Sequence, residues 1–334
     1  MGASEFEGLP GAAVSLLKGG VGKSTIALNI ADRLATRGHE TVLIDLDKDG
    51  HLTTQLGYDE AYDREADIGD ALMDGKDPWE LLIETDFGVH LLPSNNDLEN
   101  VETRLKDERF ADVKLRRNVV EPLVENGYDY VIIDAAGGRG KLSDNALIAV
   151  QRVIIPLIPR AGSINGLNKM IERQIAPIRE NIGLEILAVT PNMIRETMNQ
   201  HNEHRTLVEN LNREFGPFVP EYAQIDPEVF DALDDLGQTI NPIPKPGILE
   251  LTAISRAFKR GLPVSAFDEE CDQIPNFDHL ADLVEEHSYQ CQTRTTVSAT
   301  SQNSSNRLRN ETTMRTRAAI LKRSSLRLRS QSRT

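Results

Sequence analysis

The chain has 334 residues, with 52 acidic and 37 basic side chains and a net charge of −15. Its two cysteines, Cys271 and Cys291, are too few for a disulfide framework, a four-cysteine zinc site or an iron–sulfur cluster held by one chain. No apolar run approaches the roughly 20 residues that a membrane-spanning helix needs. These totals fit a reducing cytoplasm and either one large domain with appendages or two small domains.

The charge is divided unevenly along the chain. Residues 289–334 hold ten of the Lys and Arg but only one acidic residue, Glu311, which leaves 27 basic and 51 acidic residues before position 289. A body this acidic repels DNA at long range unless its basic groups cluster, and it is tolerated best at high salt. The segment 289–334 has few large apolar residues, so we expect it to be disordered. Residues 1–10 are expected to form a flexible leader.

Short apolar runs alternate with amphipathic stretches from residue 11 to about residue 288. The runs are nearly continuous, which is typical of strands covered on both faces. They lie at residues 13–17, 41–46, 89–93, 130–134, 153–158 and 186–189. Helices are expected at residues 25–37, 145–150, 168–179 and 202–215. This alternation predicts a single doubly wound α/β domain over residues 11–288, with a mainly parallel sheet flanked by helices.

A glycine-rich loop follows the first predicted strand and leads into a helix. Its residues are Lys18, Gly19, Gly20, Val21, Gly22, Lys23, Ser24 and Thr25. In this context the backbone N–H groups cradle phosphate oxygens, and the helix N-terminus adds partial positive charge. Lys23 is expected to reach the β- and γ-phosphates, Ser24 to bind Mg²⁺ and Thr25 to contact the α-phosphate. The loop therefore predicts a P-loop hydrolase that binds ATP, or its product ADP, with Mg²⁺.

One position departs from the general P-loop pattern, because Leu17 stands where the first glycine is expected and Lys18 follows it. The run KGGVGKST resembles the deviant Walker A motif of the ParA/MinD family of ATPases, and the resemblance covers roughly residues 11–288. Further matching stretches lie at residues 42–47, 92–95, 128–134, 145–147, 152–156, 243–244 and 261–264. Two stretches depart from the family: Lys48-Asp49 replace its usual Pro-Gln, and residues 135–138 replace the prolines after Asp134.

The resemblance implies roles for individual residues. Lys18 would cross a dimer interface and stabilise charge on the partner's γ-phosphate, so that Lys18, Lys23 and Asp47 form the catalytic set. Asp47 would orient the attacking water. The remaining expectations place Asp45 and Asp134 near Mg²⁺ with Ser24, and Asn192 and Pro244 against the adenine. The alternative for Asp45 and Asp47 is that one of them only caps the following turn.

Relatives in this family bind nonspecific DNA as ATP dimers, and the resemblance therefore implies a DNA contact. The basic candidates are Arg195, Arg205, Lys245, Arg256, Lys259 and Arg260. Such residues would contact phosphates of the DNA backbone, and the alternative is a solvated, partly ion-paired surface.

The family's activity is hydrolysis of ATP to ADP and phosphate in a dimerising switch that positions or segregates DNA or another large cargo. A ParB-like or adaptor protein would stimulate hydrolysis, and the protein would be cytoplasmic or associated with the nucleoid. One alternative is a MinD-like membrane-surface ATPase that places the division site. This alternative is less favoured because residues 289–334 form no clean apolar stripe. A metal-cluster carrier of the same fold is another alternative, but this chain lacks the cysteine pair that such a carrier needs. A non-hydrolysing adaptor is a further alternative, because residues 48–49 and 135–136 differ from those usual in the family.

Overall fold

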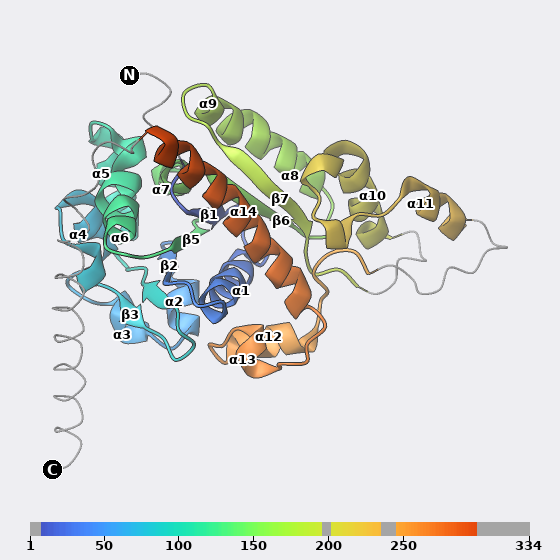
Figure 1. Ribbon diagram of the computed structural model, residues 1–334, viewed down its shortest axis with the longest axis horizontal. Coiled ribbons are helices and arrows are strands. Elements are labelled where there is room, and N and C mark those ends of the chain that lie inside the picture. Colours follow the sequence, from blue (N-terminus) through green and yellow to red (C-terminus); the bar gives the residue numbers. More distant parts are fainter. Residues whose placement is uncertain (1–7, 196–201, 235–244, 299–334) are drawn as a thin grey trace, which may run out of the picture. The chain divides into compact units, whose positions relative to one another are not determined.

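The computed structural model describes residues 8–195, 202–234 and 245–298 (Figure 1). The chain divides into two compact units, residues 1–288 and residues 289–334. The first unit is built on a seven-stranded sheet with the strand order β3-β4-β2-β5-β1-β6-β7. Its strands are β1 (Gly11–Val14), β2 (Thr41–Leu46), β3 (Ile83–Glu84), β4 (His90–Leu92), β5 (Tyr130–Ala135), β6 (Arg152–Leu157) and β7 (Glu185–Pro191).

The sheet is parallel except for the short edge strand β3, which pairs antiparallel with β4. Strand β1 lies between β5 and β6, so the chain fills one side of the sheet with β2, β4 and β5 before it crosses to β6 and β7. Open α/β sheets bind ligands at the carboxyl ends of strands beside such a change of direction. The predicted doubly wound architecture is therefore confirmed, and it places the loop after β1 at the ligand-binding edge.

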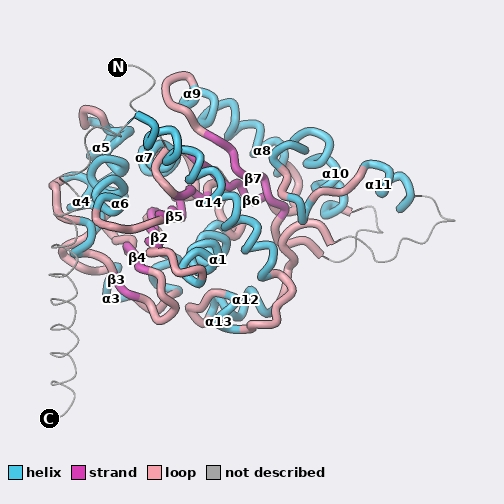
Figure 2. The backbone as a smooth tube through the Cα atoms, viewed as in Figure 1, coloured by secondary structure: helices cyan, strands magenta, loops and turns pink. Residues whose placement is uncertain are grey.

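Helices enclose the sheet on both faces (Figure 2). The longer helices are α1 (Lys23–Thr36), α5 (Leu98–Asp107), α7 (Lys141–Val150), α8 (Ser163–Met170), α10 (Glu203–Phe215), α11 (Pro227–Asp234), α12 (Thr252–Lys259) and α14 (Ile274–Ser298). The shorter ones are α2 (His51–Gln55), α3 (Asp59–Tyr62), α4 (Ile68–Met73), α6 (Glu121–Glu125), α9 (Ala176–Arg179) and α13 (Val264–Phe267). Single 3₁₀ turns lie at η1 (Pro78–Glu80), η2 (Ala111–Val113), η5 (Gly216–Phe218) and η6 (Glu221–Ala223), and π-helical turns at η3 (Arg116–Val120) and η4 (Ile171–Ile175).

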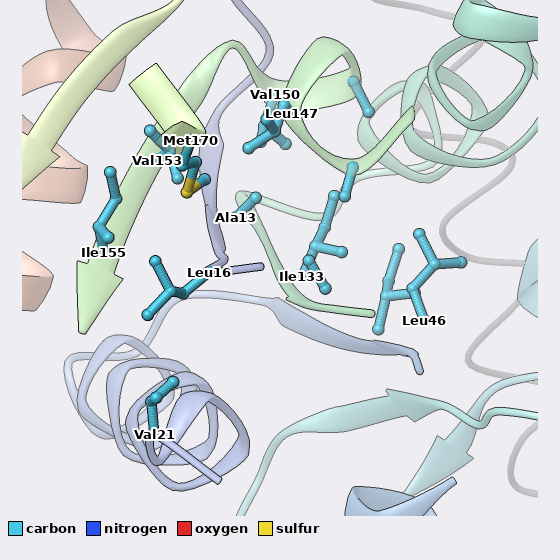
Figure 3. Close-up of a cluster of buried hydrophobic side chains, with 14 of the residues drawn as sticks. Ala13, Leu16, Val21, Leu46, Ile133, Leu147, Val150, Val153, Ile155 and Met170 are labelled. Carbon is cyan, nitrogen blue, oxygen red and sulfur yellow. The ribbon is translucent and has the colours of Figure 1, made fainter. Parts of the chain in front are cut away.

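Alternate residues of each central strand enter two separate hydrophobic clusters. Ala13 and Ile133 face the cluster that also contains Leu147, Val150 and Val153 (Figure 3). The intervening side chains of β1, β2, β5 and β6 pack instead against α1, α12, α13 and α14. Because a strand's side chains alternate between faces, both faces must be apolar when both are covered. For this reason the apolar runs in the sequence are continuous and do not alternate with polar residues.

The predicted helices are found with shifted boundaries. The helix expected at 168–179 begins at Ser163 and continues through α8, η4 and α9, where Pro177 stands within the first two residues of α9. The expectation that residues 289–334 are disordered needs a correction, because α14 continues to Ser298. Residues 1–7 and 299–334 lie outside the described residues, so the rest of the predicted leader and tail stay predictions. Within the described part of the chain, no helix has the length and apolar character needed to cross a membrane.

Candidate active site

The glycine-rich loop connects β1 to α1 at the carboxyl edge of the sheet. Gly20 and Gly22 have φ angles of 70° and 85°, which are left-handed values that glycine adopts without strain. A side chain at Gly22 would also collide with Asn192, because a β-carbon there would lie 2.3 Å from Asn192 Nδ2. Lys18, Gly19 and Gly20 are exposed, whereas Val21 is buried. The loop thus has the open backbone that phosphate binding requires.

Lys23 begins α1 and is only 6% exposed. Its ammonium group lies against Gly137, since a β-carbon at Gly137 would be 3.6 Å from Lys23 Nζ and 3.8 Å from Gly19 Cα. The loop that follows β5 therefore closes over the phosphate-binding loop. Ser24 follows Lys23 in the first turn of α1, where the helix N-terminus favours anions.

Two predicted acidic residues meet at the ends of neighbouring strands. Asp45 of β2 is paired in register with Asp134 of β5, and both side chains are fully buried. Burial raises the pKa of Asp45 to about 6, because a charged carboxylate loses its hydration there. Burial, together with the neighbouring charge of Asp45, raises the pKa of Asp134 to about 8. Ionisation of both carboxylates is therefore unfavourable when no cation compensates their charge.

The two carboxylates differ in their partners. Asp45 accepts hydrogen bonds from the Thr53 backbone N–H (2.8 Å), the Thr53 hydroxyl (2.7 Å) and the Asp47 backbone N–H (3.2 Å). Both Asp45 oxygens are therefore occupied by the protein. These hydrogen bonds fix the start of α2 and the chain at Asp47. The places of Asp45, Ser24 and Asp134 near Mg²⁺ stay predictions.

Asp134 has no hydrogen-bond partner for either carboxylate oxygen among the described residues. Ser24 and Lys23 nevertheless lie close enough to lower its pKa, against the larger effect of burial. A buried, unpaired carboxylate is unfavourable unless a cation or donor completes it. Oxygen ligands of this kind suit Mg²⁺, which is usually held by one or two carboxylates together with phosphate groups. Since no three His, Cys, Asp or Glu side chains form a metal-binding group in the described ranges, Mg²⁺ would need the phosphates of a nucleotide to complete its coordination.

Asp47 lies just beyond β2 and is half-buried. Its carboxylate accepts hydrogen bonds from the backbone N–H groups of Gly137 (3.3 Å) and Asp49 (3.2 Å). The Ser94 hydroxyl donates to the Asp47 carbonyl at 2.6 Å. Asp47 and Lys23 therefore both lie against Gly137, in the loop that follows β5. A water-orienting role for Asp47 stays a prediction, and this position beside the phosphate loop fits it.

Asn192, at the end of β7, supports the phosphate loop directly. Its side-chain Nδ2 donates to the Val21 carbonyl at 2.8 Å, and the residue is 5% exposed. This contact makes Asn192 a positioning residue, which the sequence did not indicate. Recognition of adenine by Asn192 stays a prediction. Pro244 lies outside the described residues.

The predicted basic candidates separate into different environments. Arg256 and Lys259 are exposed on α12, and Arg260 follows directly with its guanidinium 5.2 Å from the Phe267 ring centroid. Positions 256, 259 and 260 share one helix face, because residues three and four apart are neighbours. Arg195 forms an ion pair with Glu250 at 3.0 Å, and Lys245 is exposed.

Arg205 is a wrong candidate for DNA contact. It is 1% exposed, and its Nη2 donates to the Phe230 carbonyl at 2.9 Å. Its guanidinium therefore joins α10 to α11 in the interior. DNA contact by the remaining basic residues stays a prediction.

Several contacts of the site were not foreseen from the sequence. They include the Thr53 donors to Asp45, the Gly137 N–H that faces Asp47, and the Ser94 hydroxyl. Ser94 lies in one of the stretches that match the family, yet no local pattern in the sequence signals the partner of Ser94 or of Thr53. The contacts of Gly137 and Ser94 with Asp47 join residues that the order of the strands brings together, whereas Thr53 meets Asp45 within the β2–α2 segment.

Known proteins resemble the chain in sequence over most of its length. A family described as an AAA domain matches residues 12–186. Protein MJECL24 of Methanocaldococcus jannaschii is 30% identical over 279 residues, which cover 81% of this chain and 96% of that protein. The sporulation initiation inhibitor protein Soj of Bacillus subtilis is 32% identical over 160 residues, 48% of this chain and 62% of Soj. The cell division protein PomZ of Myxococcus xanthus is 35% identical over 157 residues, 46% of this chain and 48% of PomZ.

Solved structures show the same fold. Cobyrinic acid a,c-diamide synthase from Mycobacterium smegmatis, with bound ADP and magnesium, is 28% identical with a TM-score of 0.56, covering 64% of this chain and 84% of that one. Apo McdA of Cyanothece, at 20% identity, has a TM-score of 0.64 and covers 84% and 99% of the two chains. A plasmid partition protein of Borrelia burgdorferi bound to AMPPNP, at 21% identity, has a TM-score of 0.61 and covers 83% and 99%. The family match and the sequence relatives, with the phosphate loop and its paired acids, show that this chain belongs to the ParA/MinD family of P-loop ATPases.

Proposed function

We propose that this protein is an ATP-dependent dimerising switch that positions or segregates DNA or another large cellular cargo. It would bind ATP with Mg²⁺, assemble as a homodimer, engage a surface, and hydrolyse ATP to ADP and phosphate when a partner protein stimulates it. Support comes from the relatives, whose names include partitioning and cell-division proteins. Hydrolysis then acts as a timer that ends the dimeric state.

The position of Lys18 carries the proposal. Of the two lysines in the loop, Lys23 is buried beside Asp134, whereas Lys18 is exposed and forms no ion pair with any described residue. An exposed lysine that forms no ion pair within the described part of its own chain is available to a second chain. Placed across a two-fold interface, it would supply positive charge to the partner's γ-phosphate as hydrolysis proceeds.

The other site residues have distinct tasks in this proposal. The N–H groups of the loop and Lys23 bind and orient the phosphates, while Ser24 and Asp134 would hold Mg²⁺, which neutralises phosphate charge when bound. Asp47 would position the attacking water beside Gly137. Asn192 fixes the loop backbone through Val21, and Thr53 fixes Asp45.

The surface that the dimer engages would be formed in part by Arg256, Lys259 and Arg260. These three exposed cations share one face of α12 in a chain with 15 more acidic than basic residues. Two copies of the patch, one from each protomer, would contact the phosphate backbone without reading its sequence. Binding of this kind weakens steeply with salt.

The test is light scattering after size exclusion of the full chain with Mg²⁺ and either ADP or ATP. We expect a dimer with ATP alone, and its accumulation in Asp47→Ala, which would bind ATP without hydrolysing it. Lys18→Ala should bind ATP but stay monomeric, whereas Lys23→Ala should lose nucleotide binding. Lys106→Ala, which removes another exposed lysine on α5, serves as the matched control.

A Lys18→Ala protein that still dimerises with ATP and hydrolyses it at the wild-type rate would contradict the proposed role of Lys18. An ATP-bound wild type that stays monomeric would contradict the switch. For a confirmed dimer, sedimentation with duplex DNA and with anionic vesicles then decides which surface it binds.

A further inference from the structure

A single aromatic side chain, Phe110, stands out on the surface. It is 69% exposed, and Trp79, at 37%, is the other large hydrophobic residue that is exposed in the described part of the chain. Phe110 also has a φ of 57° and a ψ of 30°, in the left-handed region that bulky residues avoid. Strained, exposed residues of this kind are typical of binding sites.

The strained conformation is imposed by α7. The side-chain Nδ2 of Asn145 donates to the Ala111 carbonyl at 2.8 Å, and the Leu115 N–H donates to Asn145 Oδ1 at 3.0 Å. Asn145 is fully buried, so these two bonds hold the chain on either side of η2 in place. Phe110, just before η2, is consequently held out from the surface on a rigid support.

A groove of about 390 Å³ lies beside Phe110, between η2, α7 and the segment η4–α9. Val113, Ile148, Pro177 and Ile178 give it an apolar lining. A groove of this size, with an aromatic residue at its edge, accommodates one or two side chains of another chain.

The charges around the groove are unbalanced. Lys141 is paired with Asp112 at 2.6 Å, and Asp144 accepts a hydrogen bond from Gln174 at 2.9 Å. Arg139 and Arg173 also line the groove, and Arg139 lies close enough to Asp144 to lower the pKa of that carboxyl, against the larger effect of burial. Arg117 lies nearby, with its guanidinium carbon 5.8 Å from the Phe110 ring centroid. The lining thus holds three basic and two acidic side chains, and in a protein with excess acid a basic rim beside an apolar groove indicates an acidic partner.

The loop between β5 and α7 links the groove to the active site. Arg139 lies in the loop between β5 and α7, two residues after Gly137, whose N–H donates to the Asp47 carboxylate. At the end of the same loop, Gly140 packs against Glu102 of α5 so closely that a β-carbon would overlap it. A molecule that holds Arg139 therefore acts on the segment that faces Asp47 and Lys23.

We propose that this groove binds a peptide segment of a partner protein, in which one apolar or aromatic residue is flanked by carboxylates. The apolar residue would pack against Phe110, Val113 and Ile178, and the carboxylates would pair with Arg139 and Arg173. Peptide binding depends only on the groove, whereas an effect of the peptide on hydrolysis rests on the proposed function.

Other occupants fit the surface less well. The chain's own segment 299–334 has one acidic residue, Glu311, among many arginines, so Arg139 and Arg173 would repel it. Nucleic acid would meet Asp112 and Asp144 in the same lining, and its binding needs many cations rather than two. The apolar lining would make no favourable contact with a phosphate backbone.

The test uses a random dodecapeptide library displayed on phage and selected on the full chain without nucleotide. We expect enriched sequences with acidic residues next to a Leu, Phe or Trp. A synthetic fluorescent peptide of the enriched sequence should bind Phe110→Asn and Arg173→Glu at least about tenfold more weakly than wild type, while Trp79→Asn binds normally. Asn tolerates left-handed backbone, so Phe110→Asn should keep or raise the melting temperature, which separates lost binding from lost folding.

Several results would overturn the proposal. One is a selection that yields no sequences discriminating wild type from Phe110→Asn, and another is an enrichment of basic sequences. Displacement of the peptide by a 20-base-pair duplex in a manner that depends on Phe110 would assign the groove to nucleic acid instead. If the peptide binds as expected but leaves ATP hydrolysis unchanged, the proposal that the groove binds a peptide is supported. The proposal that this binding affects the switch is then contradicted.

Discussion

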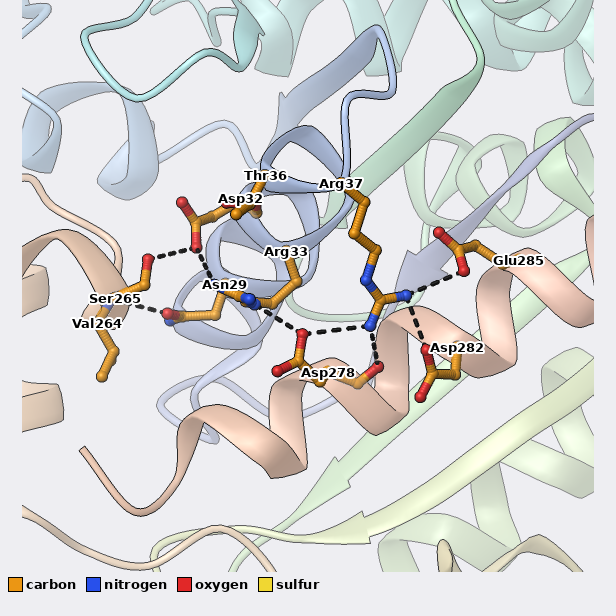
Figure 4. A network of polar contacts seen from close by, with 10 residues as sticks. All are labelled: Asn29, Asp32, Arg33, Thr36, Arg37, Val264, Ser265, Asp278, Asp282 and Glu285. Atoms are coloured by element: carbon orange, nitrogen blue, oxygen red, sulfur yellow. Dashed lines mark hydrogen bonds and ion pairs between the residues drawn. The ribbon is translucent and has the colours of Figure 1, made fainter. Parts of the chain in front are cut away.

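Two regions of this protein differ in how their carboxylates are buried and paired. At the carboxyl edge of the sheet, Asp134 is fully buried and has no hydrogen-bond partner among the described residues. Between α1 and α14, Asp278 is only half-buried, yet Arg33 and Arg37 both contact it, at 2.8 and 3.2 Å (Figure 4). The more costly carboxylate is therefore the one without a partner.

The α1–α14 contact shows how completely the chain can satisfy its charges. Arg37, which follows the last turn of α1, also contacts Asp282 at 2.8 Å, Glu285 at 3.0 Å and the Asp278 carbonyl at 3.1 Å. A cation at the C-terminal end of α1 further interacts favourably with the helix dipole. This network joins the helix that begins at the phosphate loop to α14, far along the sequence.

This difference shows that the lack of a partner for Asp134 is not a consequence of the acidic composition. Arginines are available, and they are placed where α1 meets α14. At the nucleotide edge the missing partner has to come from outside the chain, and phosphate-bound Mg²⁺ supplies it in our proposal. The unsatisfied carboxylate of Asp134 is therefore explained by nucleotide binding, and the ion pairs of Asp278 by the packing of α14 on α1.

The largest expected effect comes from Asp134→Asn. Loss of the carboxylate that we propose holds Mg²⁺ should lower ATP hydrolysis by about a hundredfold or more, because a bound metal contributes several kcal/mol of charge stabilisation. Without nucleotide, the free energy of unfolding should rise by roughly 1 kcal/mol at pH 8, since the charged carboxylate beside Asp45 is gone. Steady-state phosphate release and urea unfolding measure the two effects.

Asp278→Asn is the matched control for that variant. It should leave hydrolysis unchanged and lower the free energy of unfolding by about 1 kcal/mol, because Arg33 and Arg37 lose a charged partner. An Asp278→Asn protein as inactive as Asp134→Asn would show that the two regions do not divide function from stability.

Arg37→Ala should have the next largest effect, on stability alone. It leaves Asp278, Asp282 and Glu285 close together without their shared cation, so we expect a loss of about 2 kcal/mol in the free energy of unfolding. The KM for ATP should not change. Thermal unfolding in low and high salt measures this, and the deficit should shrink as salt screens the three carboxylates. A deficit that is independent of salt would instead indicate lost packing of the arginine stem.

Asn192→Ala tests the support of the phosphate loop. The Val21 carbonyl would lose its donor, and a buried unpaired carbonyl costs about 1–2 kcal/mol, which corresponds to roughly tenfold weaker ATP binding if the loop becomes mobile. Titration with a fluorescent ATP analogue measures the affinity. Weaker binding of ATP and of free triphosphate alike would assign the effect to the loop, whereas a loss for ATP alone would support contact with adenine.

Much of the fold could be predicted because its cause is local. Six continuous apolar runs became six strands, since a strand covered on both faces requires apolar side chains throughout. The edge strand Ile83–Glu84 was missed because two residues carry no periodicity. The start of α8 at Ser163 was missed as well, because Gly162 and Gly166 weaken the helical pattern there.

The site likewise has some features with a local cause in the sequence and others that depend on the tertiary fold. The phosphate loop was predicted because its glycines and lysines are adjacent in sequence, and Asp134 because it ends an apolar strand. The hydrogen bond from Asn192 to Val21 joins residues 171 positions apart, and that from Gly137 to Asp47 spans 90. Only the order β2-β5-β1-β6-β7 brings such residues together. Arg205 was mistaken for a surface residue because its burial is a tertiary property.

The smallest expected effect is the pH dependence of the nucleotide-free protein. The folded-state pKa values of Asp45 and Asp134, about 6 and about 8, lie above the ordinary value of 3.8. The folded state therefore binds more protons than the unfolded state between these values, so stability from these groups falls as the pH rises. We expect the free energy of unfolding to decrease by roughly 1 kcal/mol between pH 6 and pH 8 in wild type, and the decrease to be smaller in Asp134→Asn. Saturating ATP with Mg²⁺ should remove or reverse the decrease, because metal binding favours the ionised carboxylate. Urea unfolding at each pH measures the slope, and an equal slope in wild type and Asp134→Asn would mean that Asp134 finds a partner within the chain, as Asp278 does.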